Sequence, residues 1–207
     1  KVVILMLGVL LCCGGLTQAI DIDFNSVNPV GTIQNSDNYD QVTLHDSAIV
    51  TMMGGSAQSV LSYNSSIFQF QNGTVFGFIS VCDTSSLTMS GGSVPGLQVY
   101  DSSITNLTGG NITGSLAIYG TGAGNAVVNI YGKNLNSIPD HRGGMSIVGN
   151  WGDAASSPFA IWCRGYSGPT PGSPDSPIIF HTVPEPLTVS LLAFGCSLIR
   201  CKRKTWD

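Results

Sequence analysis

The chain has 207 residues, of which only 10% are charged and 26 are glycine. A low charge content, against about 25% in typical soluble domains, with abundant Gly, Ser, Thr and Asn favours strands and turns over helix. Between Ile20 and Val183, ten Asp and no Glu stand against three basic residues, a net charge of 3 − 10 = −7. This acidic body repels phosphate backbones, which argues against nucleic acid as a partner.

The first predicted element, residues 1–19, is a secretory signal peptide. Lys1 is followed by the apolar run VVILMLGVLLCCGGL, and Thr17 and Ala19 occupy the −3 and −1 positions of a cut after Ala19. The alternative is a buried first strand or helix, but a globular element seldom begins a chain without any polar residue. We therefore expect an exported protein.

The body, residues 20–163, contains four consecutive stretches that match one another: DSAIVTMMGGSAQSVLSY, NSSIFQFQNGTVFGFISV, CDTSSLTMSGGSVPGLQVY and DSSITNLTGGNITGSLAIY. A turn glycine recurs at steps of 18, 19 and 18 residues, at Gly55, Gly73, Gly92 and Gly110. A repeat of this length, with alternating apolar residues and no helical period, predicts an all-β, single-stranded β-solenoid (β-helix-like) with coils of about 18 residues.

Two inward columns of side chains are expected in this solenoid. One consists of Ile49, Ile67, Leu87 and Ile104, and the other of Leu61, Ile79, Leu97 and Leu116. The competing architecture is a sandwich of short antiparallel strands, which also has turns at regular intervals. The solenoid is favoured because the repeats match in residue identity as well as in hydrophobicity.

The flanks of the repeats are expected to cap the solenoid. VGTIQNSDNYDQVTL, before Asp46, is interpreted as a degenerate first coil, and MSIVGNWGDAASSPFAIW as a terminal pair of strands. In that pair Trp151, Phe159 and Trp162 would cover the open end, since an exposed last coil would pair with another molecule. Residues 164–182 form a predicted Pro/Gly/Ser-rich linker, within which IIFHT is a candidate last strand.

The last predicted element, residues 183–207, is a membrane anchor. The rigid Pro184-Glu185-Pro186 precedes a 13-residue apolar run, Leu187–Ile199, and then a basic cluster of Arg200, Lys202, Arg203 and Lys204. The run is shorter than the ~20 residues that span a bilayer comfortably. A basic cluster resists translocation, so we expect the charges inside and the body outside the membrane.

This segment resembles the PEP-CTERM sorting signal of Gram-negative bacteria, which combines a Pro-Glu-Pro motif, a hydrophobic stretch and a terminal basic cluster. The resemblance covers about 25 residues, from Val183 to Asp207. It implies recognition by an exosortase, a membrane cysteine transpeptidase-like enzyme, at or near Pro184, Glu185 and Pro186. It also implies an inner-membrane-tethered precursor, and then a role at the cell surface connected with exopolysaccharide or biofilm.

Candidate chemistry in the body is sparse. Its three histidines share no ligand spacing, and the sequence contains no H-E-x-x-H, C-x-x-C or G-x-S-x-G motif. Asp46, Asn64, Asp83 and Asp101 recur at one corner at steps of 18, 19 and 18 residues. They are interpreted as turn-capping residues, each accepting a hydrogen bond from the backbone two residues on. The alternative is a calcium ion that relieves the repulsion between Asp83 and Asp101.

Two further features leave alternatives open. Cys82 and Cys163, the cysteines of the body, can form one disulfide in an exported chain or remain two unpaired, buried thiols. Tyr63, Tyr100 and Tyr119 recur at the end of the repeats and either stack on sugar rings or simply cover a sheet.

Taken together, the sequence predicts an exported, non-enzymatic surface protein without a cofactor, sorted by an exosortase and structural in the extracellular matrix or biofilm. The alternative is a polysaccharide-binding module, or a polysaccharide lyase or hydrolase, on the same scaffold.

Overall fold

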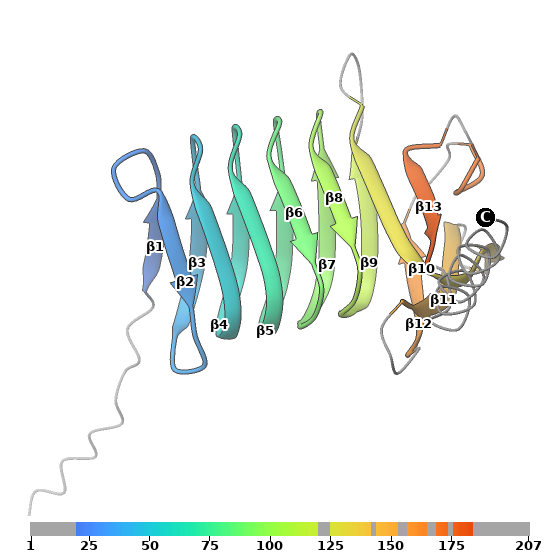
Figure 1. The fold of residues 1–207 in the computed structure, drawn as a ribbon, viewed down its shortest axis with the longest axis horizontal. Coiled ribbons are helices and arrows are strands. Elements are labelled where there is room, and N and C mark those ends of the chain that lie inside the picture. Colours follow the sequence, from blue (N-terminus) through green and yellow to red (C-terminus); the bar gives the residue numbers. More distant parts are fainter. Residues whose placement is uncertain are drawn as a thin grey trace, which may run out of the picture.

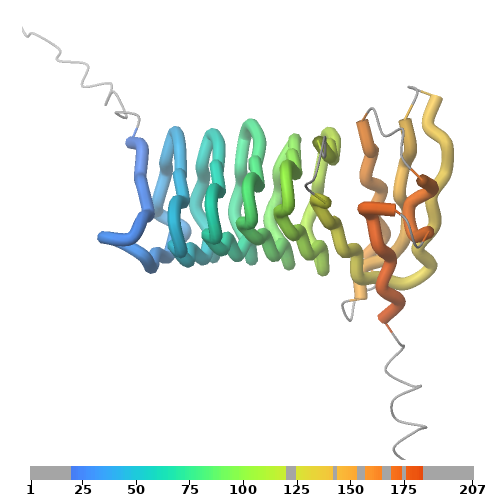
Figure 2. The backbone as a smooth tube through the Cα atoms, turned by 90° about the horizontal axis from the view of Figure 1, so that it is seen from above, coloured from blue at the N-terminus to red at the C-terminus, as the bar shows by residue number. Residues whose placement is uncertain are grey.

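The computed structural model describes residues 20–119, 125–141, 144–152, 157–164, 169–173 and 176–183. Every regular element in these ranges is a β-strand, and the strands wind into a β-solenoid of about six turns (Figure 1). Successive coils follow one another along a single axis (Figure 2). Strands of successive repeats pair in parallel, which confirms the all-β solenoid and rules out the antiparallel sandwich for the repeats.

Each coil has two straight sides, so the stacked coils form two walls. The coils are built from β1 (Asp21–Phe24), β2 (Val30–Ile33), β3 (Asn38–Leu44), β4 (Ile49–Ser62), β5 (Ile67–Val81), β6 (Ser86–Met89), β7 (Ser93–Tyr100), β8 (Ile104–Leu107) and β9 (Asn111–Tyr119). The first wall consists of β2, the first parts of β4 and β5, β6, β8 and the start of β10. The second wall consists of β1, β3, the second parts of β4 and β5, β7 and β9.

The core lies between the two walls. In the first wall, however, the predicted inward column combines residues that point inward with residues that point outward. Ile49 and Ile104 are 39% and 46% exposed, whereas Leu87 is fully buried. The register shows an inward column one residue further along, formed by Val50, Phe68, Leu87, Thr105 and Val128. Side chains alternate along a strand, so an alignment error of one residue exchanges the inward and outward faces.

The expected column in the second wall is largely correct. Ile79, Leu97 and Leu116 are in register and buried. Val60 precedes them in this column, while Leu61 pairs with Ser80 on the outward-facing side. The expected column was therefore wrong at Leu61 for the same reason as in the first wall.

One corner of each coil depends on glycine. Gly55, Gly73, Gly92 and Gly110 have φ angles of 72°, 111°, 75° and 90°, which other residues adopt only with strain. Space is also lacking, since a Cβ at Gly73 would lie 2.8 Å from the carbonyl oxygens of Gly54 and Gly55 in the preceding coil. A Cβ at Gly92 would overlap the ring of Phe70. The turn glycines thus allow both the corner and the close stacking of coils.

The N-terminal end of the core is filled by Phe24. β2 and β3 form the degenerate first coil that the sequence predicted. Gly31 is in register with the inward-facing Val50, and a Cβ at Gly31 would overlap the ring of Phe24. Phe24 is 4% exposed. Its ring therefore occupies the core position that Gly31 leaves empty.

The C-terminal end is built from four strands that leave the repeat pattern: β10 (Val127–Asp140), β11 (Gly144–Trp151), β12 (Pro158–Cys163) and β13 (Ile178–Thr182). β10 pairs with β8 in parallel through its first residues and with β11 antiparallel through its later ones. The predicted terminal strand pair is confirmed as β11 and β12, which are antiparallel. β12 continues the second wall, because its last two residues pair in parallel with Ser115 and Leu116 in the middle of β9.

Trp151 attaches this strand pair to the solenoid. Its ring stacks on Phe159 with centroids 4.0 Å apart, and its Nε1 donates a 3.0 Å hydrogen bond to the carbonyl oxygen of Gly110. Trp151 is buried and Phe159 is half-buried against the core, while Trp162 is also half-buried. The hairpin is thus held at the glycine corner of the last regular coil.

The IIFHT segment at the end of the predicted linker forms β13. This strand pairs in parallel with β10 over five residues and extends the first wall, and Ile178 is fully buried. Gly172, earlier in the same segment, donates a 2.8 Å hydrogen bond to the carbonyl oxygen of Ile178. The solenoid domain therefore includes this strand.

Candidate functional site

The residues predicted to direct export and sorting lie outside the described part of the chain. They are the cleavage residue Ala19, the motif Pro184, Glu185 and Pro186, and the basic cluster Arg200, Lys202, Arg203 and Lys204. Within the described ranges, no helix has the length and apolar character needed to cross a bilayer. The structure therefore describes only the candidate residues of the body. They lie at the corner that contains Asp46, Asn64, Asp83 and Asp101 and on the outward faces of the two walls.

The corner opposite the glycines is formed by an Asx ladder, the residues Asp46, Asn64, Asp83 and Asp101. All four have φ angles of 56° to 58°, in the left-handed region that Asp and Asn tolerate better than most residues. This backbone conformation explains why only Asp or Asn occupies the position in the four repeats.

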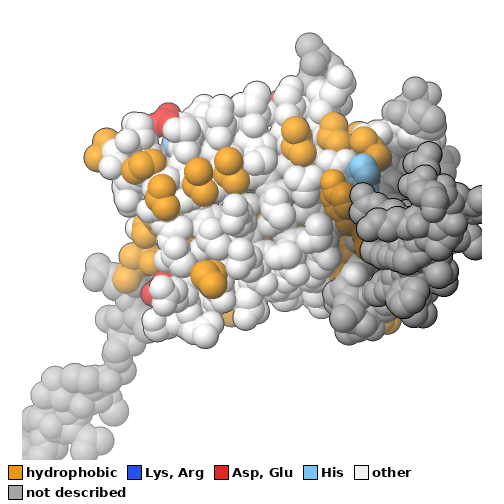
Figure 3. Space-filling model, viewed as in Figure 1, with side chains coloured by type: hydrophobic (Ala, Val, Ile, Leu, Met, Phe, Trp, Pro, Cys, Tyr) orange, Lys and Arg blue, Asp and Glu red, His pale blue; other side chains and the backbone are white. Residues whose placement is uncertain are grey.

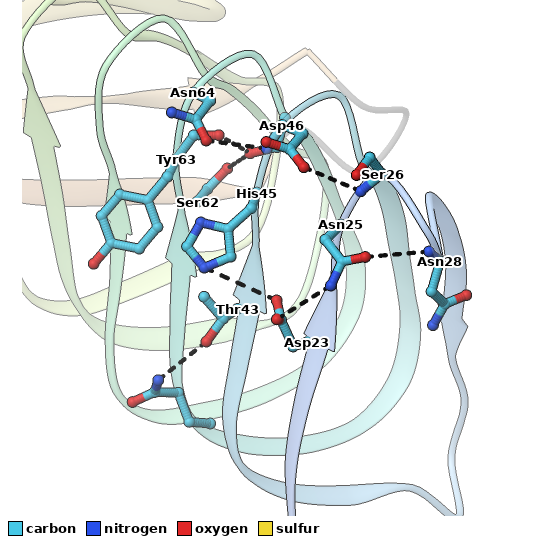
Figure 4. A network of polar contacts seen from close by, with 12 residues as sticks. Asp23, Asn25, Ser26, Asn28, Thr43, His45, Asp46, Ser62, Tyr63 and Asn64 are labelled. Carbon is cyan, nitrogen blue, oxygen red and sulfur yellow. Dashed lines mark hydrogen bonds and ion pairs between the residues drawn. The ribbon is translucent and has the colours of Figure 1, made fainter.

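Each side chain of the Asx ladder binds the backbone of the preceding coil. The amide of Asn64 donates to Asp83 Oδ2 at 2.8 Å, and the amides of Asp46 and Asp83 donate to the next ladder residues at 3.1 and 3.2 Å. At the first coil, Asp46 Oδ2 accepts from the amide of Ser26 at 3.1 Å (Figure 4). These side chains do accept backbone hydrogen bonds, but the donor is a residue one coil earlier, so the predicted bond from the residue two positions on was wrong.

Buried serines complete the same corner. Ser66, Ser85 and Ser103 are fully buried, and their Oγ atoms donate to the carbonyl oxygens of Tyr63, Cys82 and Tyr100 at 2.6 to 2.7 Å. Ser85 and Ser103 also reach carbonyl oxygens of the preceding coil at 3.1 and 3.0 Å. The hydroxyls therefore satisfy backbone groups inside the corner, as buried polar groups require.

The alternative of a calcium site at Asp83 and Asp101 gains no further acidic, His or Cys ligand from the described part of the chain. Calcium binds six to eight oxygen atoms. Within the described ranges, no group of three or more His, Cys, Asp or Glu side chains is placed to hold a metal ion. Both carboxylates accept backbone hydrogen bonds instead. The calcium alternative to the predicted capping role is tested by a melting experiment in the Discussion.

The expected tyrosine column follows the same corner on the second wall and includes two other residue types. His45 stacks on Tyr63 at 5.2 Å, and Tyr100 stacks on Tyr119 at 4.7 Å, with interplanar angles of 10° and 14°. Cys82 occupies the position between Tyr63 and Tyr100, since Ser62 pairs with Val81 and Val81 with Val99. Burial raises the pKa of Tyr63 and of Tyr100.

The stacking bears on the sugar-binding interpretation of this column. A sugar ring stacks on an exposed aromatic face. In this column the faces of His45 and Tyr63, and of Tyr100 and Tyr119, are turned toward each other along the solenoid axis. The geometry therefore favours the role of covering the second wall.

The two cysteines of the body are free thiols in the structure. Cys82 lies in the tyrosine column, between Tyr63 and Tyr100. Cys163 is buried at the end of the second wall, in register with Leu116. Burial raises the pKa of Cys82, and the carboxylates of Asp101 and Asp83 raise it further. Burial alone raises the pKa of Cys163 to about 12. Both thiols are thus protonated near neutral pH and are poor nucleophiles.

The histidines lie on separate elements. His45 Nε2 is 3.9 Å from Asp23 Oδ1 near the first coil (Figure 4), and His141 Nδ1 is 3.5 Å from Asp140 Oδ1 beyond β10. His181 on β13 stacks on Tyr131 at 4.4 Å, and its Nε2 is 2.9 Å from Asn129 Oδ1. The fold does not bring the three together, as their spacing in the sequence indicated.

Two rows of outward side chains on the first wall were not recognised from the sequence. The aliphatic row contains Val30, Ile49, Ile67, Ile104 and Val127 and is interrupted by one polar residue, Ser86. The polar row beside it contains Thr32, Thr51, Gln69, Thr88, Asn106 and Asn129. Figure 3 shows hydrophobic side chains along this face, with charged ones at its margins. The sequence signal for these two rows is the alternation of side chains in IVT, IFQ, SLT and ITN. If the second residue of each triplet points inward, its first and third residues point outward.

Comparison of the chain with protein families, with curated proteins and with solved structures found no match. The function is therefore inferred from the residues and the geometry described above.

Proposed function

We propose that this chain is an exported, non-enzymatic surface protein of a Gram-negative bacterium, sorted by an exosortase and structural in the extracellular matrix. The observation that carries the proposal is the order of features in residues 183–207. Pro184-Glu185-Pro186, an apolar run and a basic cluster follow one another as in a PEP-CTERM signal. In this proposal the precursor is held transiently in the inner membrane, with the solenoid outside.

The geometry of the body supports a structural role. The repeated carboxylates and amides of the Asx ladder are engaged in hydrogen bonds from coil to coil. The serines of the same corner likewise bind backbone carbonyls. The recurring Asx side chains thus serve the stacking of the scaffold, and each coil supports its neighbours as in other solenoids.

The sorting part of the proposal is tested by replacing Pro184, Glu185 and Pro186 with alanine in the full chain. We expect loss of surface display and accumulation of the uncut protein in the inner membrane. Mass spectrometry of the wild-type protein recovered from the surface should show a shortened C-terminal end. The matched control changes Pro169 and Pro171, which have the same Pro-x-Pro spacing outside the motif. Normal display of the triple-alanine variant would overturn the proposal.

The non-enzymatic part needs a separate test because solenoid scaffolds also carry polysaccharide lyases and hydrolases. Purified protein is incubated with acidic and neutral polysaccharides, and new reducing ends and unsaturated products are measured. We expect neither. Product formation that scales with protein concentration would establish the enzymatic alternative.

A further inference from the structure

The outward face of the first wall is a strip without charge on an acidic protein. The aliphatic and polar rows run side by side along the solenoid, and neither contains Asp, Glu, Lys or Arg. The neighbouring corner carries Asp46, Asp83 and Asp101, which are exposed. An acidic chain laid on this strip would be repelled by the corner, whereas an uncharged chain would not.

The two rows offer different chemistry on one surface. Val30, Ile49 and Ile104 in the aliphatic row are 68%, 39% and 46% exposed and present C–H groups. In the polar row, Thr51 Oγ1 donates to Gln69 Oε1 at 3.2 Å, and Asn129 Nδ2 donates to Asn106 Oδ1 at 3.0 Å. A carboxamide has two donor hydrogens and two acceptor lone pairs, so these bonds orient the amides and leave capacity for a ligand.

The dimensions fit an extended polymer better than a second protein. Five strand spacings of about 4.8 Å separate β2 from β10, and four residues span about 13 Å, so the strip measures roughly 24 by 13 Å, or about 300 Å². A stable protein interface buries about 800 Å² per partner. A narrow strip with an apolar side and a hydrogen-bonding side matches a sugar chain, whose rings have C–H faces and hydroxyl edges.

We propose that the outward face of the first wall binds a neutral, extended polysaccharide along the solenoid axis. The ring C–H faces contact the aliphatic row, and the hydroxyls bond to the amides and hydroxyls of the polar row. This inference rests on the proposed matrix function and names the class of matrix polymer with which the protein associates.

The test is depletion of the full chain from solution by insoluble neutral glycans, namely amorphous cellulose, curdlan and mannan, with alginate beads as the acidic counterpart. We expect binding to at least one neutral glycan, little effect of added salt, and no retention on alginate. Ile49→Asp on the strip should weaken binding at least about tenfold. The matched control is Leu61→Asp, on the outward side of the second wall in the same strand, and it should bind as the wild type does.

A milder pair keeps the test valid if an aspartate variant fails to fold. Thr51→Ala alters the polar row, and Thr43→Ala makes the same change on the second wall. Loss of binding in Thr51→Ala alone supports the proposal. Absence of binding to all three neutral glycans, or equal binding to alginate, overturns it. The proposal is also overturned if the wild type is a dimer and Ile49→Asp makes it monomeric, since the strip would then be an interface between copies of this chain. Surface display in the Pro184-Glu185-Pro186 experiment is unaffected by these outcomes, so the two proposals fail separately.

Discussion

Replacing Asp83 tests the physical account of the Asx ladder. Two features of Asp83 contribute to stability. Its backbone has a φ of 58°, which Asp tolerates better than most residues, and its Oδ2 accepts a 2.8 Å hydrogen bond from the amide of Asn64. The left-handed conformation costs an ordinary L-residue roughly 1–2 kcal/mol. A hydrogen bond contributes about 0.5–1.5 kcal/mol, and the lower part of this range applies because Asp83 is exposed.

Three substitutions separate these effects. Asp83→Asn keeps both and should leave the free energy of unfolding nearly unchanged. Asp83→Gly keeps the backbone conformation but loses the bond, and should cost about 0.5–1 kcal/mol. Asp83→Ala loses both and should cost about 2 kcal/mol, or a decrease in melting temperature of about 4–8 °C.

Denaturant titration and thermal melting monitored by circular dichroism measure the series. The expected order of stability is wild type and Asn, then Gly, then Ala. An alanine variant as stable as the asparagine variant would refute the account. Repeating the melts with calcium tests the metal alternative: a rise in the wild-type melting temperature that Asp83→Asn and Asp101→Asn abolish would establish a calcium site at this corner.

The remaining predictions concern the core. Thr105 is fully buried, and its hydroxyl has no hydrogen-bond partner among the described residues, so Thr105→Val should raise the free energy of unfolding by about 1 kcal/mol in a denaturant titration; a destabilised valine variant would contradict this. Gly92→Ala should lower the free energy of unfolding by at least about 2 kcal/mol, because φ is 75° and the new Cβ would overlap Phe70. The control Gly96→Ala should cost less, since its Cβ would make its nearest contact at 3.4 Å. Burial raises the pKa of Cys163 from 9.0 to about 12. The unfolded thiol therefore ionises first, and stability should fall between pH 9 and 12 by at most about 1.4 kcal/mol per pH unit. Melts across this range should show a smaller loss in Cys163→Ala, and an identical pH dependence would refute the assignment.

The period of the chain determined the architecture. Gly55, Gly73, Gly92 and Gly110 recur at coil length because the backbone at one corner requires positive φ. The Asx ladder recurs at the same length because the other corner requires the left-handed region. These are local requirements of single residues, so they are visible in a single sequence. They suffice to predict a solenoid, its coil length and its two corners.

The inward-pointing face of each strand depends on how the coils align with one another. Ile49 and Val50 are both β-branched aliphatic residues, and alternation alone cannot choose between them. The choice follows from the register of all coils at once, in which Phe68 and Leu87 align with Val50 and not with Ile49. The uncharged strip is hidden in the sequence for this reason, because alternation alone allows Ile49 and Ile104 to be placed in the core, whereas the structure exposes them.

Contacts between coils were equally beyond local reasoning. A turn at Asp83 can be predicted from the adjacent residues, but only the stacking of coils places the amide of Asn64 2.8 Å from Oδ2 of its carboxylate. Likewise, IIFHT had the composition of a strand, and the available edge of β10 made it part of the first wall. Local conformation is encoded in a few adjacent residues, whereas a hydrogen-bond partner in another coil exists only after the chain has closed a full turn.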